Sequence, residues 1–193
     1  PRRRPPGIGK EWHLLMYDDP DKQAAYRSIQ DYSTELLLWR VMYTVNAFLH
    51  SPVLPAVQDK LRKTVEQLQT RMLSISNTPA TQQLTEDIGR SNDAFIDYIH
   101  ALAAGDSQSQ AYHKRWEEAR NKIIKKICQV VPGSAEVWKA MLDHETELLN
   151  KTIQNIQDGK YRDMTDLASL LRRLAADMTD YMANGVLHDH LPA

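Results

Sequence analysis

Cysteine and long apolar runs are scarce in this chain, and each scarcity excludes a class of protein. Cys128 is the single cysteine among 193 residues, so the chain cannot form an internal disulfide framework or a cysteine-based metal site. No window approaches the roughly 20 apolar residues of a membrane span, and the first residues lack the apolar core of a signal peptide. We therefore expect a soluble protein. The lone thiol mildly favours a reducing compartment such as the cytoplasm. A virion or other large complex is the other expected location.

A strong charge of either sign is also missing. Lys and Arg number 24 against 25 Asp and Glu, which leaves a net charge of −1. The whole molecule therefore has no long-range field that would draw it onto nucleic acid, and any basic surface must be local. The hydrophobic content of 42% is enough for the core of one compact domain.

The basic residues of the N-terminus form such a local surface. Residues 1–10 combine three prolines and two glycines with four cations, Arg2, Arg3, Arg4 and Lys10. This composition cannot bury apolar area, so we expect an extended arm over residues 1–21. Within it the apolar stretch 12–17, which begins with Trp12, is expected to pack on the bundle or on a partner. Because the chain begins at Pro1 rather than Met, an upstream segment or anchor remains open.

Helix breakers recur about every 25 residues through the rest of the chain, with few between them. Apolar residues between the breakers recur at helical spacing. Short links such as Gly105-Asp106 force neighbouring helices to be antiparallel. The sequence therefore predicts an all-α antiparallel bundle over residues 22–188, followed by a tail at 189–193. The expected helices are 22–50, 54–74, 80–104, 108–130, 135–157 and 161–186.

Catalytic and metal-binding motifs are missing. A di-iron bundle needs two Glu-x-x-His pairs on facing helices, and Asp97-x-x-His100 is the one related spacing. His188-Asp189-His190 has metal-ligand residue types but reads better as a frayed tail. The phosphate-binding lysine loop, the dinucleotide glycine pattern and the zincin helix are absent. We expect no enzyme, no metal and no cofactor.

Three polar residues, Glu35, Ser91 and Glu145, nevertheless interrupt the apolar stripes of the predicted helices. Glu35 shares its stripe with Leu38, Met42 and Val45. With Arg40, one turn beyond Glu35, they form the candidate central cluster. A buried carboxylate needs a partner, and Arg40 is the first candidate, with Arg172 or Arg173 as alternatives. A structural polar cluster and a ligand site both remain open, and Glu35 also fits the wet edge of its stripe.

The helix predicted at 108–130 is rich in cations. Such a run is most often a solvated face. With the arm, it also supports nucleic-acid binding as one interpretation. The cations are Arg115, Arg120, Lys122, Lys125 and Lys126.

Short motifs spread over nearly everything after the arm carry a resemblance. They are Leu38-Trp39, Tyr43-Thr44, Leu61-Arg62, Gln83-Leu84-Thr85, Ala103-Ala104-Gly105-Asp106, Arg115-Trp116, Ile123, Trp138, Met141-Leu142, Gly159-Lys160-Tyr161 and Asp180-Tyr181-Met182-Ala183-Asn184-Gly185-Val186. In this order they resemble a family of small, mostly uncharacterised bacterial six-helix bundle proteins, which implies the same fold. The family carries histidines near Arg40, Ser91, Glu145 and Leu174, which implies a metal or ligand site at its bundle centre. This chain lacks those histidines, and its Arg/Ser/Glu set suits a structural ion pair better than a metal.

Three functions follow from these observations. The first is a non-enzymatic structural or scaffolding protein that docks through its arm on protein partners in a larger assembly, such as a virion or another large complex. The second is a small-molecule or metal-binding bundle with a degenerate central site. The third is nucleic-acid binding, or attachment to an anionic surface, through the basic arm.

Overall fold

The computed structural model describes residues 20–130 and 134–188 of the chain. These residues form six α-helices and one short 3-10 turn, with no strand among them, which confirms the all-α prediction. The expected arm, apart from its last two residues, and the expected tail at 189–193 lie outside the described residues. The elements are α2 (Pro20–Phe48), α3 (Leu54–Ile75), α4 (Pro79–Ala103), α5 (Ser109–Val130), α6 (Ala135–Gln157), η1 (Tyr161–Asp163) and α7 (Met164–His188).

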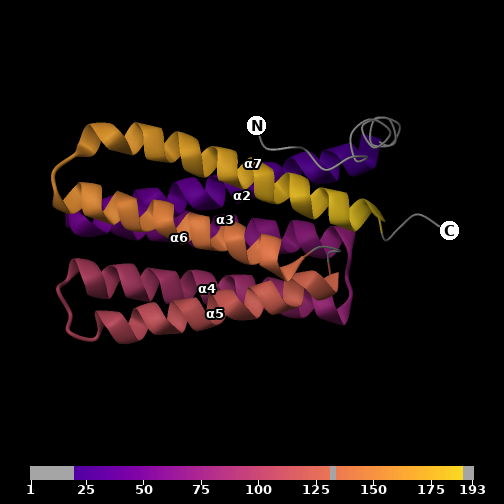
Figure 1. Cartoon of the computed structure of the whole chain (residues 1–193), viewed down its shortest axis with the longest axis horizontal. Helices are drawn as coiled ribbons and strands as arrows, with labels where there is room; N and C mark the ends of the chain where they lie inside the picture. The colour runs from indigo at the N-terminus through magenta and orange to yellow at the C-terminus, as the bar shows by residue number, and fades with distance from the viewer. Residues whose placement is uncertain (1–19, 131–133, 189–193) are drawn as a thin grey trace.

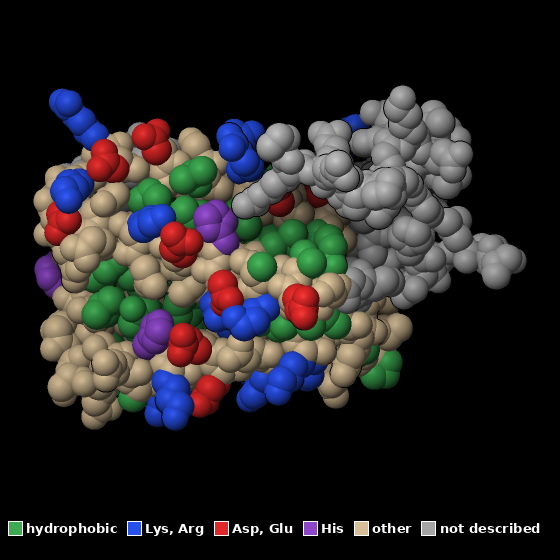
Figure 2. Space-filling model, in the orientation of Figure 1, with side chains coloured by type: hydrophobic (Ala, Val, Ile, Leu, Met, Phe, Trp, Pro, Cys, Tyr) green, Lys and Arg blue, Asp and Glu red, His purple; other side chains and the backbone are tan. Residues whose placement is uncertain are grey.

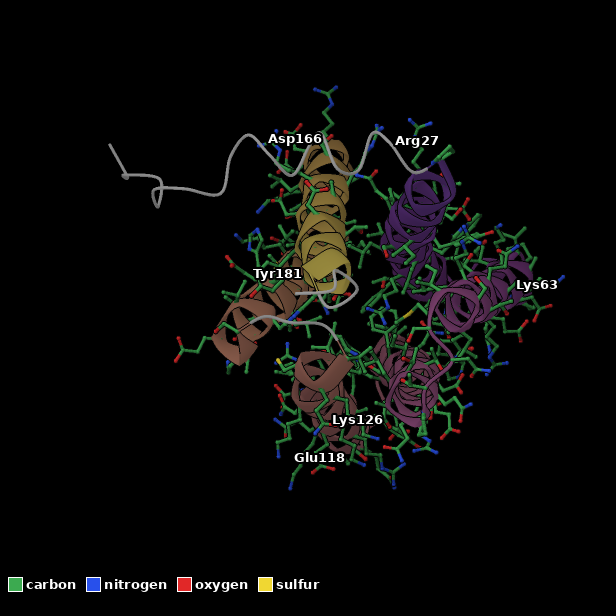
Figure 3. All side chains as sticks on the ribbon, turned by 90° about the vertical axis from the view of Figure 1, so that its right-hand side faces the viewer. Arg27, Lys63, Glu118, Lys126, Asp166 and Tyr181 are labelled. Carbon is green, nitrogen blue, oxygen red and sulfur yellow. The ribbon has the colours of Figure 1, made fainter. Side chains whose placement is uncertain are left out.

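The six helices run antiparallel to their chain neighbours and form a closed ring. Each packs on the next along the chain, and α7 returns to pack on α2 (Figures 1 and 3). α2 also contacts α4 and α6 across the ring. Because the number of these helices is even, the described chain begins and ends at the same end of the bundle (Figure 1). Side chains from every helix therefore point into the interior of the ring.

Prolines and hydroxyl caps begin the helices where the sequence predicts them. Pro79 opens α4, and the Thr78 hydroxyl accepts a hydrogen bond from the Thr81 backbone N–H at 3.2 Å. The Ser134 hydroxyl accepts from the Glu136 backbone N–H at the start of α6. Such caps satisfy donors that a helix leaves unpaired at its first turn.

Left-handed residues end three of the helices. Gly105 after α4 and Gly159 after α6 have φ of 68° and 69°, and His50 after α2 has φ of 49°. At each end the following backbone N–H turns back to a carbonyl of the last turn, as Ser51 does to Asn46 at 2.9 Å. This is the Schellman arrangement, in which glycine is the favoured residue. His50 occupies that position with a side chain.

Large apolar side chains from all six helices fill the core. Leu61, Phe95 and Leu171 have no exposed surface, and Trp138 is 1% exposed. A fully buried side chain of this kind stabilises the fold by about 1.5–3 kcal/mol. Every helix within the described ranges falls short of the apolar length that a bilayer crossing requires.

α2 buries a different face from the one that the sequence predicts. The expected stripe included Leu38 and Met42, which are 37% and 45% exposed. The buried face instead carries Leu37, Val41 and Thr44. The prediction was wrong because α2 has apolar residues on both sides, so their spacing alone does not select the inner face.

Candidate functional site

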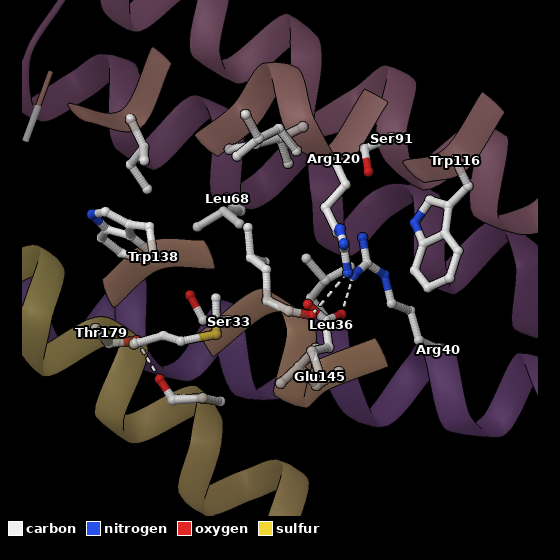
Figure 4. A pocket seen from close by; sticks show the side chains of 17 residues that line it. Ser33, Leu36, Arg40, Leu68, Ser91, Trp116, Arg120, Trp138, Glu145 and Thr179 are labelled. Atoms are coloured by element: carbon white, nitrogen blue, oxygen red, sulfur yellow. Dashed lines mark hydrogen bonds and ion pairs between the residues drawn. The ribbon is translucent and has the colours of Figure 1, made fainter. Parts of the chain in front are cut away.

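A cavity of about 100 Å³ lies at the centre of the ring. Most of its wall is apolar, with Trp116 toward one end and Trp138 toward the other in the view of Figure 4. All six helices contribute side chains to it. Examples, one from each helix, are Arg40, Leu68, Ser91, Arg120, Glu145 and Thr179.

The Arg40 and Glu145 side chains form an ion pair across this cavity, between α2 and α6 (Figure 4). Arg40 Nη1 donates to Glu145 Oε1, and the two side chains are 8% and 4% exposed. The Arg40 guanidinium also lies over the Phe95 ring, 5.3 Å from its centroid. The ring holds the guanidinium by a cation–π contact. Two charges are thus fixed in an interior where an unpaired charge would be very costly.

Arg120 enters the same cavity from α5. Its Nη1 donates to the Leu142 carbonyl at 3.2 Å and to the Thr146 hydroxyl, and its Nη2 pairs with Asp143 at 2.9 Å. These acceptors surround Glu145 on α6, so one turn of α6 holds both arginines. The Asp143 pKa is lowered, first by the hydrogen bond from Lys139 and then by the charge of Arg120.

Several polar groups of the cavity wall have no protein partner. Ser33 and Ser91 line the cavity, and within the described ranges neither hydroxyl forms a hydrogen bond. The Nε atoms of Arg40 and Arg120 and the indole N–H of Trp138 are buried without an acceptor. Buried polar groups are normally paired, and each exception costs free energy. This mostly apolar wall therefore carries more polar groups than the Arg40–Glu145 pair itself requires.

The structure brings together three of the four residues predicted as the central cluster. Arg40, Ser91 and Glu145 line the cavity and are 7%, 2% and 3% exposed. Glu35 does not join them. Its side chain is 45% exposed and pairs with Lys60 on α3 at 3.4 Å, so the assignment of Glu35 to the central cluster was wrong. Glu35 lies near the outward side of α2, the same side as Leu38 and Met42.

The partner of the buried Glu145 carboxylate is Arg40, the first candidate named from the sequence. Arg40 pairs with Glu145, whereas the alternatives Arg172 and Arg173 are exposed on α7. A second buried carboxylate, Asp87 on α4, is absent from the sequence prediction. It is 2% exposed and pairs with Lys126 of α5 at 2.9 Å.

The cationic run on α5 is not one solvated face. Arg120 and Lys126 turn to carboxylates inside or beside the bundle, and Arg115 lies over the Tyr112 ring. Lys122 and Lys125 are exposed. The interpretation of the whole run as a solvated face was therefore wrong for Arg120, which occupies the inward spacing of α5 with Trp116 and Ile123.

The face shown in Figure 2 carries both signs of charge, with blue and red side chains interspersed among the described residues. A basic stripe is the usual electrostatic footprint of nucleic-acid binding. The described residues on this face do not form such a basic stripe. The basic residues predicted to contact partners, Arg2, Arg3, Arg4 and Lys10, lie outside the described residues together with Trp12.

The metal-ligating residue types do not gather within the described ranges. No three His, Cys, Asp or Glu side chains there are placed to hold one metal ion. Asp97 and His100 are both exposed on α4, and Cys128 is a half-buried free thiol.

Comparisons of the chain with family models, with curated proteins and with solved structures give no match. The resemblance to bacterial six-helix bundle proteins thus rests on its short motifs. Of the residues near which that resemblance implies histidines, Arg40, Ser91 and Glu145 line the cavity, and Leu174 is buried on α7.

Proposed function

We propose that this chain is a small-molecule-binding helical bundle and that the central cavity is its binding site. The observation that carries the proposal is the group of polar side chains around Arg40 and Glu145, which contains more hydrogen-bonding groups than are paired within it. A purely structural ion pair is best served by tight packing and full pairing. Ligand sites instead combine apolar walls with a few convergent polar groups.

The cavity volume bounds the ligand. Pockets for drug-sized molecules and cofactors have volumes of roughly 300–1,000 Å³. An engineered apolar cavity of about 150 Å³ takes benzene. The volume of about 100 Å³ in this bundle therefore suits a compact molecule no larger than benzene, or about three waters.

The test is native mass spectrometry of the purified chain beside its denatured mass, with chemical identification of whatever is released. We expect a small molecule bound to the native chain and lost on unfolding. In Ala175→Val the added methyl groups fill the cavity wall, and the bound mass should fall. Circular dichroism establishes that the variant is folded. A clean apo mass, together with a melting temperature that no added small molecule raises, would contradict the proposal.

Docking on protein partners in a larger assembly is the second candidate. The observation that favours it is the exposed apolar row of α2, which includes Leu38, Met42 and Leu49, at 37%, 45% and 52% exposure. Exposed apolar patches often mark interaction surfaces. This candidate also accommodates the predicted contribution of the arm.

The docking candidate is tested with a tagged chain and its co-purified partners, identified and then reconstituted. Met42→Lys with Leu49→Lys should weaken reconstituted association without changing the melting temperature of the bundle. Deletion of residues 1–17 tests the arm in the same assay. Association that neither change weakens would exclude both surfaces.

A further inference from the structure

The unpaired groups of the cavity are mainly hydrogen-bond donors. Glu145 accepts from Nη1 of Arg40, no described acceptor meets Nη2, and Nε is buried without a partner. Ser91 adds a free hydroxyl on the facing helix α4. The Glu145 carboxylate is the acceptor that lines the same space, and it already holds Arg40. The open capacity of the site is therefore suited to a ligand that accepts hydrogen bonds.

The charge of the site has the matching sign. Arg40, Arg120 and Lys139 supply three cations, against the carboxylates Glu145 and Asp143. One positive charge is left over in this connected set. Glu145 pairs with Arg40 alone, whereas Asp143 is shared by Arg120 and Lys139, so the excess charge lies with these last two cations. Of the two, the Arg120 side chain is only 12% exposed and lines the cavity. A buried cation with free donors favours an anion.

The rest of the cavity wall indicates the chemistry of the part of the ligand that does not contact Arg40. In the view of Figure 4 Arg40, Arg120 and Ser91 lie toward one end of the cavity, while Leu68 and Trp138 lie toward the other. Side chains such as Ile123 and Met178 complete an apolar lining. A multiply charged anion such as phosphate would have to desolvate more charge than the single excess cation balances. A compact anion with a short hydrocarbon body fits both ends.

We propose that the cavity binds a short-chain monocarboxylate of about four to six heavy atoms, whose carboxylate accepts hydrogen bonds from Arg40 and Ser91. This inference rests on the proposed function, because it names the ligand class of the same cavity. Its hydrocarbon body lies against Leu68 and Trp138, out of water.

The probes are butyrate, butyramide and butylammonium, which share a short chain and differ in charge. Each is titrated at constant ionic strength while the melting temperature and the heat of binding are measured. Butyrate should bind saturably and raise the melting temperature by about 3–6 °C at ten times Kd. Butyramide and butylammonium should bind at least about tenfold more weakly, since a hydrogen bond to a charged group is worth about 1.5–3 kcal/mol.

Two variants locate the effect. Ser91→Ala should weaken butyrate binding about tenfold or more, by the same hydrogen-bond argument. Ser28→Ala is its matched control, because the Ser28 hydroxyl donates to Ala24 within α2, away from the cavity. The double variant Arg40→Leu with Glu145→Leu should abolish the preference for butyrate. Its control is Lys151→Ala with Glu147→Ala, an exposed pair on the same helix.

The outcomes separate the ligand class from the cavity itself. Equal binding of butyrate and butyramide, lost in Ala175→Val, would overturn the carboxylate proposal and leave the cavity as a ligand site. Butyrate binding that survives in the Arg40/Glu145 double variant would overturn it as well, because the anion would then bind elsewhere. If no probe binds, the carboxylate proposal fails. In that case a ligand found by native mass spectrometry would still establish the cavity as a binding site, and its chemistry would replace the one proposed.

Discussion

Arg40 and Glu145 stand 105 residues apart in the sequence and meet in the centre of the bundle as a buried ion pair. Removing one partner leaves the other charged in an interior with little water. We expect Glu145→Leu to lower the free energy of unfolding by about 3–5 kcal/mol. Arg40→Leu together with Glu145→Leu should cost little or stabilise the fold by up to about 4 kcal/mol, because no charge remains to be desolvated.

Urea unfolding followed by circular dichroism measures both variants. The control is the exposed pair Lys151 and Glu147, whose removal should change stability by less than about 1 kcal/mol. A double variant as unstable as the single one would contradict this account. It would mean that the Arg40 and Glu145 side chains support the fold by packing rather than by pairing.

Tyr43 makes the free energy of unfolding depend on pH in the alkaline range. Its ring is fully buried on α2, and burial raises the Tyr43 pKa to about 12, with a further rise from the charge of Asp97. A raised folded pKa means that the stabilisation is complete below pH 10, the ordinary value, and is lost as pH rises through the folded pKa. A difference of two pH units corresponds to about 2–3 kcal/mol.

Tyr43→Phe removes this ionisation. The hydroxyl donates to the Ile96 carbonyl at 3.5 Å, a long bond whose loss should cost less than about 1 kcal/mol near neutral pH. Above pH 10 the wild type should lose stability faster than the variant. Denaturant unfolding at several pH values checks the difference. Parallel pH curves for the two proteins would show that Tyr43 does not control the alkaline limit.

Asp143 makes the free energy of unfolding depend on pH in the acid range. Its pKa is lowered by Lys139 and Arg120, so the stabilisation is present above the ordinary value of 3.8 and is lost as pH falls through the lower folded pKa. The side chain is 42% exposed, and solvent screening limits the effect to less than about 1 kcal/mol. Asp143→Asn should therefore be slightly less stable at pH 7 and indistinguishable from the wild type in strong acid. A deficit that persists in strong acid, where the Asp143 carboxyl is protonated in the folded state as well, would assign the effect to the hydrogen bond with Arg120 rather than to charge.

The helices were predictable because their ends depend on local chemistry. Pro79, Gly105 and Gly159 mark ends that the structure places within a few residues of the expected positions. The site depended on long-range packing and was predicted less completely. Glu145 could be recognised as a polar residue on an apolar stripe, whereas Arg120 was hidden in a run of cations. The spacing of Arg120 from Trp116 and Ile123 is helical, and that signal could have placed it inside.

Glu35 shows the limit of such arguments. A helix that packs on both sides has apolar residues around much of its circumference, and α2 packs on α3 and α7 at once. Periodicity then no longer indicates which polar residue faces the centre. Glu35 pairs with Lys60 on α3, and no local sequence pattern connects those two residues.

The last turn of α2 supplies a test of backbone strain. His50 has a left-handed φ of 49° in the position that Gly105 and Gly159 fill after α4 and α6. A residue with a side chain pays roughly 1 kcal/mol for that conformation. His50 is exposed, so its side chain returns little packing. We expect His50→Gly to stabilise the protein by up to about 1 kcal/mol, less whatever is lost to the greater freedom of glycine in the unfolded chain.

Urea unfolding checks this expectation against two reference variants. Gly105→Ala places a side chain at the equivalent turn of α4, where an added Cβ meets nothing within 4 Å, so any loss reports backbone strain alone. It should destabilise by about 1 kcal/mol, opposite in sign to His50→Gly. His50→Ala keeps a Cβ and removes the imidazole, and it should leave stability close to that of the wild type. If His50→Ala were as destabilising as Gly105→Ala, the imidazole would be shown to stabilise the turn, and the strain argument for His50 would fail.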